Sequence, residues 1–249
     1  MHVGLLTYRT GHLKTWELAT RLLSKGFRVS VYAFPFKLRP PKDDGRYPDR
    51  PNALISLPLE EYCDRMGIRL VVMPGWDDEH APLLGAPGHA DTPEIFLHCI
   101  AKIVPASFIG GRVILNCHPG LLPHNRGVDA FKWSLLNDWP FGITLHVIDA
   151  EIDRGVILKR AKIPVLSTDT FRDVCDRAYA MEIDLMGNFE YHLKNGAYGW
   201  AVGDAHPCSH RSIPIDVDRR IEEIFIQKRN EMIDLYLDSS RFQHPSDYR

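Results

Sequence analysis

Residues 2–33 read HVGLLTYRTGHLKTWELATRLLSKGFRVSVYA, and this stretch decides the fold. Val3–Thr7 and Phe27–Ala33 are apolar runs of strand length. The apolar residues between them recur at helical spacing: Leu13, Trp16, Ala19, Leu22 and Leu23. Gly26 is placed to end that helix. A strand, a helix and a second strand in succession are typical of a parallel sheet covered by helices.

The rest of the chain continues this alternation. We expect further helices at residues 59–66, 129–137 and 170–194, the last with Thr168 or Asp169 as its N-cap. We expect a fully buried strand at 69–73 and further strands at 113–116, 143–147 and 156–162. The predicted fold class is α/β, a Rossmann-like, mostly parallel sheet flanked by helices. Residues 1–196 would form the catalytic domain, and residues 197–249 a C-terminal extension with a helix at 217–237.

Two long stretches have the composition of loops. Residues 34–51 contain five prolines and several charges and are expected to be exposed. Residues 74–93 are rich in glycine and proline and follow a predicted strand. Ligands bind at the carboxyl ends of parallel strands, so we expect the second stretch to form a flap or wall over a ligand pocket.

The composition excludes several classes of protein. The 249 residues are 45% hydrophobic and 25% charged, as in soluble globular proteins. A net charge of -2 disfavours a nucleic-acid partner. No run approaches the ~20 apolar residues of a membrane helix, so we expect a cytoplasmic protein. The five cysteines form no Cys-x-x-Cys pair, which predicts neither disulfides nor a structural metal.

The stretch from Asn116 to Gly127 reads NCHPGLLPHNRG and follows a predicted strand. Residues two apart on a strand face the same way, so Asn116 and His118 should converge. An Asn amide can donate to a developing oxyanion, and a His can take up a proton. Taken singly, each is better explained by a structural role. The turn at 149–155 adds carboxylates that could orient His118.

Three segments together resemble the folate-dependent formyltransferases. They are the run at 118–127, Gly142–His146 and Ile152–Ile157. That family includes methionyl-tRNA and glycinamide ribonucleotide formyltransferases and the sugar N-formyltransferases. The resemblance covers about residues 69–193.

The resemblance implies a catalytic group of Asn116, His118 and Asp153, and 10-formyltetrahydrofolate as formyl donor, with no metal. It also implies folate contacts from the loop after the 69–73 strand and from the turn before Asp153. The corresponding residues are Met73, Pro74, Gly75, Ile148, Asp149, Ala150 and Glu151.

The expected partner is a small-molecule amine, and the form of the motif is closest to that of the sugar N-formyltransferases. We therefore expect a nucleotide-linked amino sugar, with an amino-acid-type amine such as hydroxyornithine as the main alternative. Hydrolysis of the formyl donor and a non-catalytic binding module are further alternatives. Candidate acceptor contacts are Arg9, Trp76, Arg126, Gly127, Lys132 and Trp133. The C-terminal helix would pack on the body or in a homodimer through its apolar residues.

Overall fold

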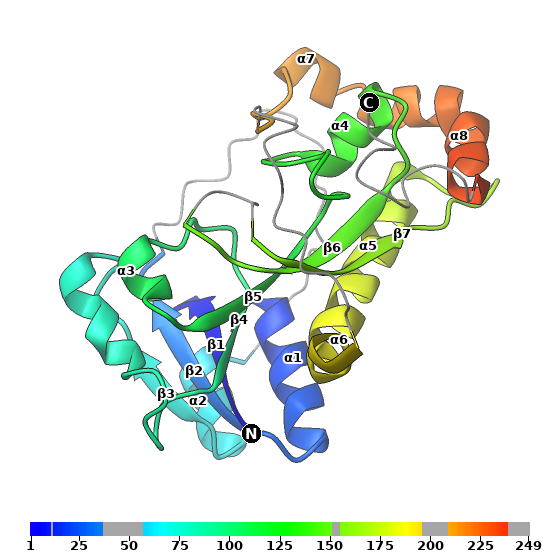
Figure 1. Cartoon of the computed structure of the whole chain (residues 1–249). Helices are drawn as coiled ribbons and strands as arrows, with labels where there is room; N and C mark the ends of the chain where they lie inside the picture. The colour runs from blue at the N-terminus through cyan, green and yellow to red at the C-terminus, as the bar shows by residue number, and fades with distance from the viewer. Residues whose placement is uncertain (11, 37–56, 151–154, 196–208, 239–249) are drawn as a thin grey trace.

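The computed structural model describes residues 1–10, 12–36, 57–150, 155–195 and 209–238. These residues form one seven-stranded sheet in the order β3-β2-β1-β4-β5-β6-β7 (Figure 1). The strands are β1 (His2–Tyr8), β2 (Arg28–Phe34), β3 (Arg69–Val72), β4 (Ile95–His98), β5 (Val113–His118), β6 (Gly142–Val147) and β7 (Ile157–Lys162). The expected α/β class and the mostly parallel sheet are confirmed.

The first five strands are parallel, and β6 and β7 are antiparallel additions. From β1 the chain moves outward to β2 and β3, and then returns to β4 on the other side of β1. The order of the strands therefore reverses between β1 and β4. In open α/β sheets such a switch point, at the carboxyl ends of the strands, is where ligands bind.

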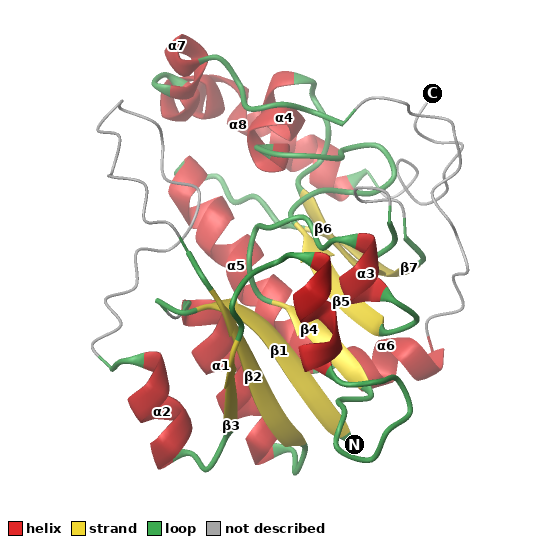
Figure 2. Ribbon diagram, turned by 90° about the vertical axis from the view of Figure 1, so that its left-hand side faces the viewer, coloured by secondary structure: helices red, strands yellow, loops and turns green. Residues whose placement is uncertain are grey.

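Helices cover both faces of the sheet (Figure 2). They are α1 (Leu13–Ser24), α2 (Leu59–Arg65), the 3-10 helix η1 (Asp78–Leu84), α3 (Ala106–Ile109), α4 (Ala130–Leu136), α5 (Phe171–Gly187), α6 (Phe189–Asn195), α7 (Ile215–Asp218) and α8 (Ile221–Leu237). The larger core cluster joins α1, α2 and α5 to one face through residues such as Leu5, Leu97 and Leu145. The smaller one joins η1 and α3 to the other face through Phe96 and Ile114.

Two predicted elements differ from the structure. The third strand was expected to be fully buried, but β3 is an edge strand, and Val72 is 49% exposed. The predicted helix at 170–194 is divided at Asn188 into α5 and α6. Lys25 Nζ binds the carbonyl oxygen of Gly187 at 2.6 Å and so satisfies an acceptor at the end of α5.

The N-cap of α5 also differs from expectation. Thr170 caps this helix in place of Thr168 or Asp169, because Thr170 and Asp173 form a reciprocal capping box. The Asp169 carboxylate instead forms an ion pair with Arg177, with Oδ2 2.8 Å from Arg177 Nη1.

The stretch 74–93 is a packed crossover, since a parallel connection must return from the end of β3 to the start of β4. It contains η1, whose residues Ala81 and Leu84 are buried in the smaller core cluster, and η1 packs against α3. The prediction of a flap is therefore wrong for the packed part of this stretch, and a wall over a ligand pocket stays a prediction. The expected exposed excursion at 34–51 lies almost entirely outside the described residues.

The C-terminal helix packs within the chain. Ile221, Phe225 and Met232 of α8 are buried in the same core cluster as α5 and β6. Lys132 of α4 and Asp218 of α7 form a buried ion pair at 2.8 Å. Of the two arrangements expected for this helix, the structure therefore shows packing on the body. The boundary expected near residue 196 lies outside the described residues.

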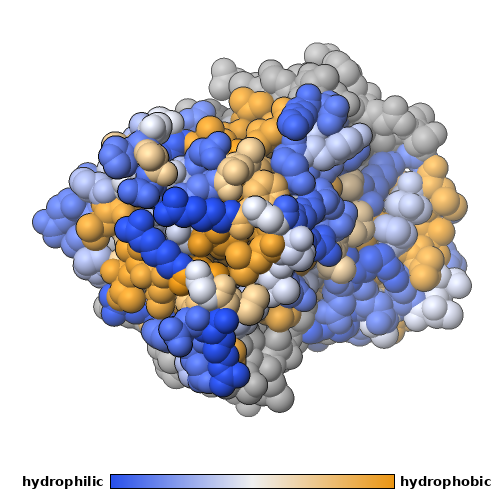
Figure 3. Space-filling view, turned by 90° about the horizontal axis from the view of Figure 1, so that it is seen from below, coloured by the Kyte–Doolittle hydropathy of each residue, from blue (hydrophilic) through white to orange (hydrophobic). Residues whose placement is uncertain are grey.

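No helix in the described part of the chain is long and apolar enough to cross a membrane. Nor do three His, Cys, Asp or Glu side chains gather there as a metal site. Seen from below in the orientation of Figure 1, the surface has hydrophobic areas bordered by hydrophilic side chains (Figure 3).

Candidate active site

The carboxyl ends of β1, β4 and β5 meet at the switch point of the sheet. Tyr8 is the last residue of β1, and His98 is the last residue of β4. Asn116 and His118 lie among the last three residues of β5. Leu97 pairs with Leu115, so His98 lies beside Asn116 in the neighbouring strand. The strand order therefore brings polar side chains together at the place where this class of sheet binds ligands.

Asn116 is positioned by β6. It pairs with His146 in the antiparallel register, and its Nδ2 lies 3.3 Å from His146 Nε2. His146 Nδ1 lies 3.1 Å from the carbonyl oxygen of Val147, which can only accept a hydrogen bond. Nδ1 therefore carries the hydrogen, and in the neutral ring Nε2 is the acceptor. One hydrogen of the Asn116 amide is held by His146, and the second is left to bind an oxygen at the site.

His118 is fixed by the loop that follows it. Extended backbone continues through Cys117, as expected, so Asn116 and His118 lie on one side of β5. His118 is 3% exposed, and its Nε2 lies 2.8 Å from the carbonyl oxygen of Asn125. Nε2 must donate to this carbonyl, so in the neutral ring Nδ1 is the nitrogen that carries no hydrogen. Nδ1 is the atom that could take up a proton.

The loop 119–125 is held rigidly enough to position His118. Thr144 Oγ1 accepts from the backbone of Leu122 at 3.0 Å and donates to the carbonyl of Gly120 at 2.7 Å. Asn125 Nδ2 donates to the carbonyl of Ala130 at 2.6 Å and to Ser134 at 2.9 Å. A side chain at Gly120 would press on His118 and on the Asn125 carbonyl, so glycine is required there.

His98 belongs to the same cluster and was missed from the sequence. It is 4% exposed, and burial together with the positive charge of Lys14 lowers its pKa to about 4. It is therefore neutral at pH 7. Lys14 is held by Glu182 at 2.6 Å in a buried ion pair between α1 and α5. The signal was a histidine at the end of the apolar run 95–98, but only the strand order places it beside Asn116.

The residues expected to hold folate after the third strand lie far from Asn116. Met73, Pro74 and Gly75 follow β3, and three strands separate β3 from β5. With a spacing of about 4.8 Å between neighbouring strands, this is roughly 19 Å. The expectation that these residues hold a ring system beside Asn116 therefore does not fit the fold. The loop at residues 99–104, which follows β4, is the adjacent one and was not identified as a candidate.

Arg9 and Trp76 lie on the β1 and β3 side of the switch point. Arg9 is exposed, and its guanidinium donates to the carbonyl of Met73 at 2.9 Å. Trp76 stacks on Phe34 with ring centroids 3.5 Å apart, and it also contacts Phe108 at 5.3 Å. Arg9 is thus exposed beside Met73, on the β3 side of the switch point, whereas Trp76 is largely committed to packing.

The turn before the expected catalytic Asp is described only in part. Ile148 donates to the carbonyl of Ile114 at 2.7 Å, which holds this turn against β5. Asp149 and Ala150 are exposed. Glu151 and Asp153 lie outside the described residues. Beyond them, Gly155 lies so close to the carbonyl of Val147 that a larger residue would collide with it.

The remaining acceptor candidates contact the C-terminal segment. The carbonyl of Arg126 accepts from the backbone of His210 at 2.8 Å, and Gly127 pairs with His210 in a parallel bridge. Gly127 has a φ of 93°, and a side chain there would strike His210. Trp133 stacks on His210 at 4.7 Å and donates to the carbonyl of Arg211 at 2.7 Å. Trp133 and Gly127 therefore attach the C-terminal segment to the body, as Lys132 does.

The geometry defines an α/β protein with an Asn and His pair at a ligand-binding switch point. Residues 92–188 match the family model for formyl transferase. A dTDP-4-amino-4,6-dideoxyglucose formyltransferase of Mycobacterium tuberculosis is 31% identical over 101 residues, which are 41% of this chain and 43% of that protein. A GDP-perosamine N-formyltransferase of Brucella melitensis is 29% identical over 133 residues, 51% of each chain.

The fold agrees with these matches. An N-formyltransferase structure from Helicobacter canadensis, in complex with folinic acid and dTDP-3-aminofucose, aligns with a TM-score of 0.59 at 17% identity. The alignment covers 91% of this chain and 81% of that one. The chain spans about half or less of the length of the two curated relatives above. Over residues 92–188 the chain is similar to the formyl transferases, and its fold is that of the N-formyltransferase structure above.

Proposed function

We propose that this chain transfers the formyl group of 10-formyltetrahydrofolate to the amine of a nucleotide-linked amino sugar. The observation that carries the proposal is the placement of Asn116 and His118 on one side of β5 at the switch point. Both residues lie within the segment that matches the formyl transferase family. The second amide hydrogen of Asn116 and Nδ1 of His118 supply the two polar functions that an acyl transfer needs.

The chemistry follows from these two side chains. The acceptor amine attacks the formyl carbon, and the carbonyl oxygen gains negative charge in a tetrahedral intermediate. Asn116 donates a hydrogen bond to this oxygen, which lowers the barrier. His118 takes the proton from the attacking nitrogen. The bond from the formyl carbon to N10 of the folate then breaks, and N10 receives the proton that His118 took from the amine. Asp153 would favour the charged form of His118 and so stabilise this proton transfer.

The folate would lie beside β4 and β5. Residues 99–104 and Ile148–Ala150 flank the carboxyl end of β5 and replace Met73–Gly75 as the proposed contacts. Backbone groups of such loops can bind a flat heterocycle by hydrogen bonds without charged side chains. Of the original set, Ile148, Asp149, Ala150 and Glu151 remain candidates.

The acceptor is proposed from the relatives and from one exposed cation. The two curated relatives are named for amino sugars linked to dTDP and GDP. Arg9 is exposed after β1 with its guanidinium at Met73, away from Asn116, where it would meet the phosphate of a long nucleotide-linked acceptor whose amine lies at Asn116. Arg126 is more than nine-tenths buried, so the exposed Arg9 is the stronger candidate for the phosphate contact.

An acceptor panel tests the proposal. The purified chain is given 10-formyltetrahydrofolate with dTDP-linked amino sugars, GDP-perosamine, hydroxyornithine or no amine, and tetrahydrofolate release and the mass of the product are followed. We expect formylated product with a nucleotide-linked amino sugar only. Product with hydroxyornithine alone would show that the acceptor is an amino-acid-type amine. Tetrahydrofolate release without an amine would favour hydrolysis, and no turnover in any arm would contradict the proposal.

Arg9→Gln is the variant that tests the nucleotide contact. Loss of one phosphate interaction should raise KM for the amino sugar about tenfold, with little change in kcat or in folate affinity. Arg28→Gln is the matched control. Arg28 is an exposed arginine at the amino end of β2, whereas Arg9 follows the carboxyl end of β1. Equal KM values in the two variants would remove Arg9 from the acceptor site.

A further inference from the structure

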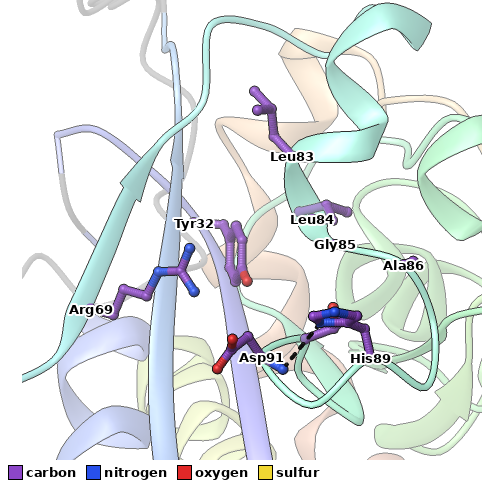
Figure 4. Close-up of a pocket in the computed structure, with 9 residues that line it drawn as sticks. Tyr32, Arg69, Leu83, Leu84, Gly85, Ala86, His89 and Asp91 are labelled. Atoms are coloured by element: carbon purple, nitrogen blue, oxygen red, sulfur yellow. Dashed lines mark hydrogen bonds between the residues drawn. The ribbon is translucent and has the colours of Figure 1, made fainter.

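A recess lies beside β2 and β3 and faces the amino ends of the strands, whereas Asn116 lies near the carboxyl end of β5. It has a volume of about 280 Å³ and lies between β2, the start of β3 and the segment 83–92 that precedes β4 (Figure 4). Tyr32, Arg69, Leu83, His89, Asp91 and Thr92 line it. Arg69 is the first residue of β3, and Thr92 comes just before β4, so the recess faces the amino ends of these strands. It is therefore separate from the candidate active site.

The hydroxyl of Tyr32 is the unusual feature of this recess. Tyr32 is 2% exposed, and its ring packs against Phe96 with centroids 5.5 Å apart. Its oxygen points into the recess (Figure 4). In the described part of the chain, this hydroxyl has no hydrogen-bond partner. The ring of Tyr32 is thus buried while its hydroxyl is open to the recess, where it can bind a polar group of a ligand.

The charge around the hydroxyl is mainly positive. The guanidinium of Arg69 extends toward Tyr32 and has no ion-pair partner among the described residues (Figure 4). Arg112 is fixed to the carbonyl of Gly85, a lining residue of the recess, at 2.6 Å. Asp91 carries the opposing charge, which Arg28 offsets at 3.5 Å.

These charges also bear on the state of the hydroxyl. Burial raises the pKa of Tyr32, and the positive charges of Arg69, Arg112 and Arg28 only partly oppose this. Tyr32 is therefore protonated at neutral pH and can donate its hydrogen. A ligand oxygen placed between Tyr32 and Arg69 would receive a neutral and a charged hydrogen bond.

We propose that this recess binds a small organic anion, with Arg69 and the Tyr32 hydroxyl holding a carboxylate or phosphate group. Leu83 and Leu84 form an apolar wall that can cover a short carbon skeleton. The volume is below the usual range for drug-sized ligands and suits a molecule about as large as an amino acid. This site is independent of the proposed formyl transfer.

The test is a titration followed by NMR with three probes: inorganic phosphate, acetate and phenyl phosphate. The side-chain Nε–Hε signal of Arg69 reports on the recess. We expect saturable shifts in the millimolar range, with phenyl phosphate bound more tightly than inorganic phosphate because of the apolar wall. Tighter binding of acetate than of both phosphates would identify a carboxylate as the natural group and would also support the site.

Three variants distinguish a specific binding site from nonspecific charge attraction. Tyr32→Phe keeps the packed ring, removes only the hydroxyl and should weaken phenyl phosphate about threefold to tenfold. Arg69→Gln should weaken it at least about tenfold, as judged from the backbone signals of residues 83–92. Arg65→Gln is the matched control, because Arg65 is an exposed arginine on nearby α2 outside the recess.

The contrary results are equally clear. Shifts that do not saturate, or equal affinities in Arg65→Gln and Arg69→Gln, would show general charge attraction and overturn the proposal. Unchanged affinity in Tyr32→Phe would show that the hydroxyl does not bind the ligand. The reason for proposing a specific site would then be lost. Binding should persist in Asn116→Ala, and its loss there would mean that the probes occupy the active site.

Discussion

Asn116 and His146 face each other across β5 and β6, with Asn116 Nδ2 3.3 Å from His146 Nε2. The carbonyl of Val147 holds the hydrogen of His146 on Nδ1, so that Nε2 accepts from Asn116. This chain of two hydrogen bonds decides which end of the Asn116 amide faces the histidine. It leaves one N–H of Asn116 for the oxygen that becomes charged during formyl transfer.

His146 should therefore act as a positioning residue. In His146→Phe the amide of Asn116 loses its orientation, and kcat should fall about tenfold with KM little changed. In His146→Gln the side-chain carbonyl can accept from Asn116, so we expect partial recovery. The check is steady-state kinetics together with folate-analogue affinity. Equal losses in the two variants would mean that His146 contributes only packing.

Asp153 is the third member of the proposed catalytic group. Asp153→Asn keeps the size of the side chain and removes the charge that favours a protonated His118, so turnover should fall about 100-fold or more. Affinity for a folate analogue should change little, because the loss is confined to the transition state. Glu151→Gln is the control and should keep most of the activity. Near-normal turnover in Asp153→Asn, or a loss explained wholly by a lower Tm, would remove Asp153 from the group.

His98 should make stability depend on pH. Its pKa of about 4 in the folded chain lies below the ordinary value of 6.5, so the unfolded chain binds the proton more readily. The stability that neutral His98 contributes to the folded chain is fully present above pH 6.5 and is lost as the pH falls toward 4. Between pH 7.5 and 5.0 this residue should remove about 2 kcal/mol of unfolding free energy. Urea unfolding of the parent and of His98→Leu checks this, since the variant should lose less stability over that range. Parallel curves would contradict a neutral buried His98.

The ion pair of Lys132 with Asp218 should tie the C-terminal segment to the body. Either single variant, Lys132→Met or Asp218→Leu, removes one side of this buried pair and should cost about 3 kcal/mol, less for Asp218→Leu because Asp129 also lies 3.7 Å from Lys132. The double variant should recover much of this loss, and urea unfolding of all four proteins measures the coupling. Additive losses in the double variant would show that the two helices are not energetically linked through this pair.

Much of the fold could be predicted because its signals are local. The helical spacing at residues 13–23 and the apolar runs on either side of it correspond to α1, β1 and β2. The burial of Val72 could not be predicted, because an edge strand and a central strand have the same apolar pattern. At Asn188, where the long helix divides, the carbonyl of Gly187 is bound by Lys25, which is distant in sequence.

The site was predicted in part for the same reason. Asn116 and His118 are two residues apart on one strand, so their common direction follows from local geometry. Met73 was expected to contact the folate because the resemblance assigns such contacts to the loop after the 69–73 strand, but which strands are neighbours is a property of the whole sheet. His98 and His146 come from the strands on either side of β5, and only the pairing reveals them. Trp133 could not be assigned to packing until the position of His210 was known.

The most direct test of the account is product formation by His118→Ala beside the parent protein. At saturating 10-formyltetrahydrofolate and with the preferred nucleotide-linked amino sugar, the parent should yield formylated sugar and tetrahydrofolate in equal amounts. His118→Ala should be at least about 100-fold slower while keeping its fold and its affinity for the folate, because Nδ1 is the proposed proton acceptor. A folded variant with the rate of the parent, or a parent that formylates no amine, would contradict the assignment.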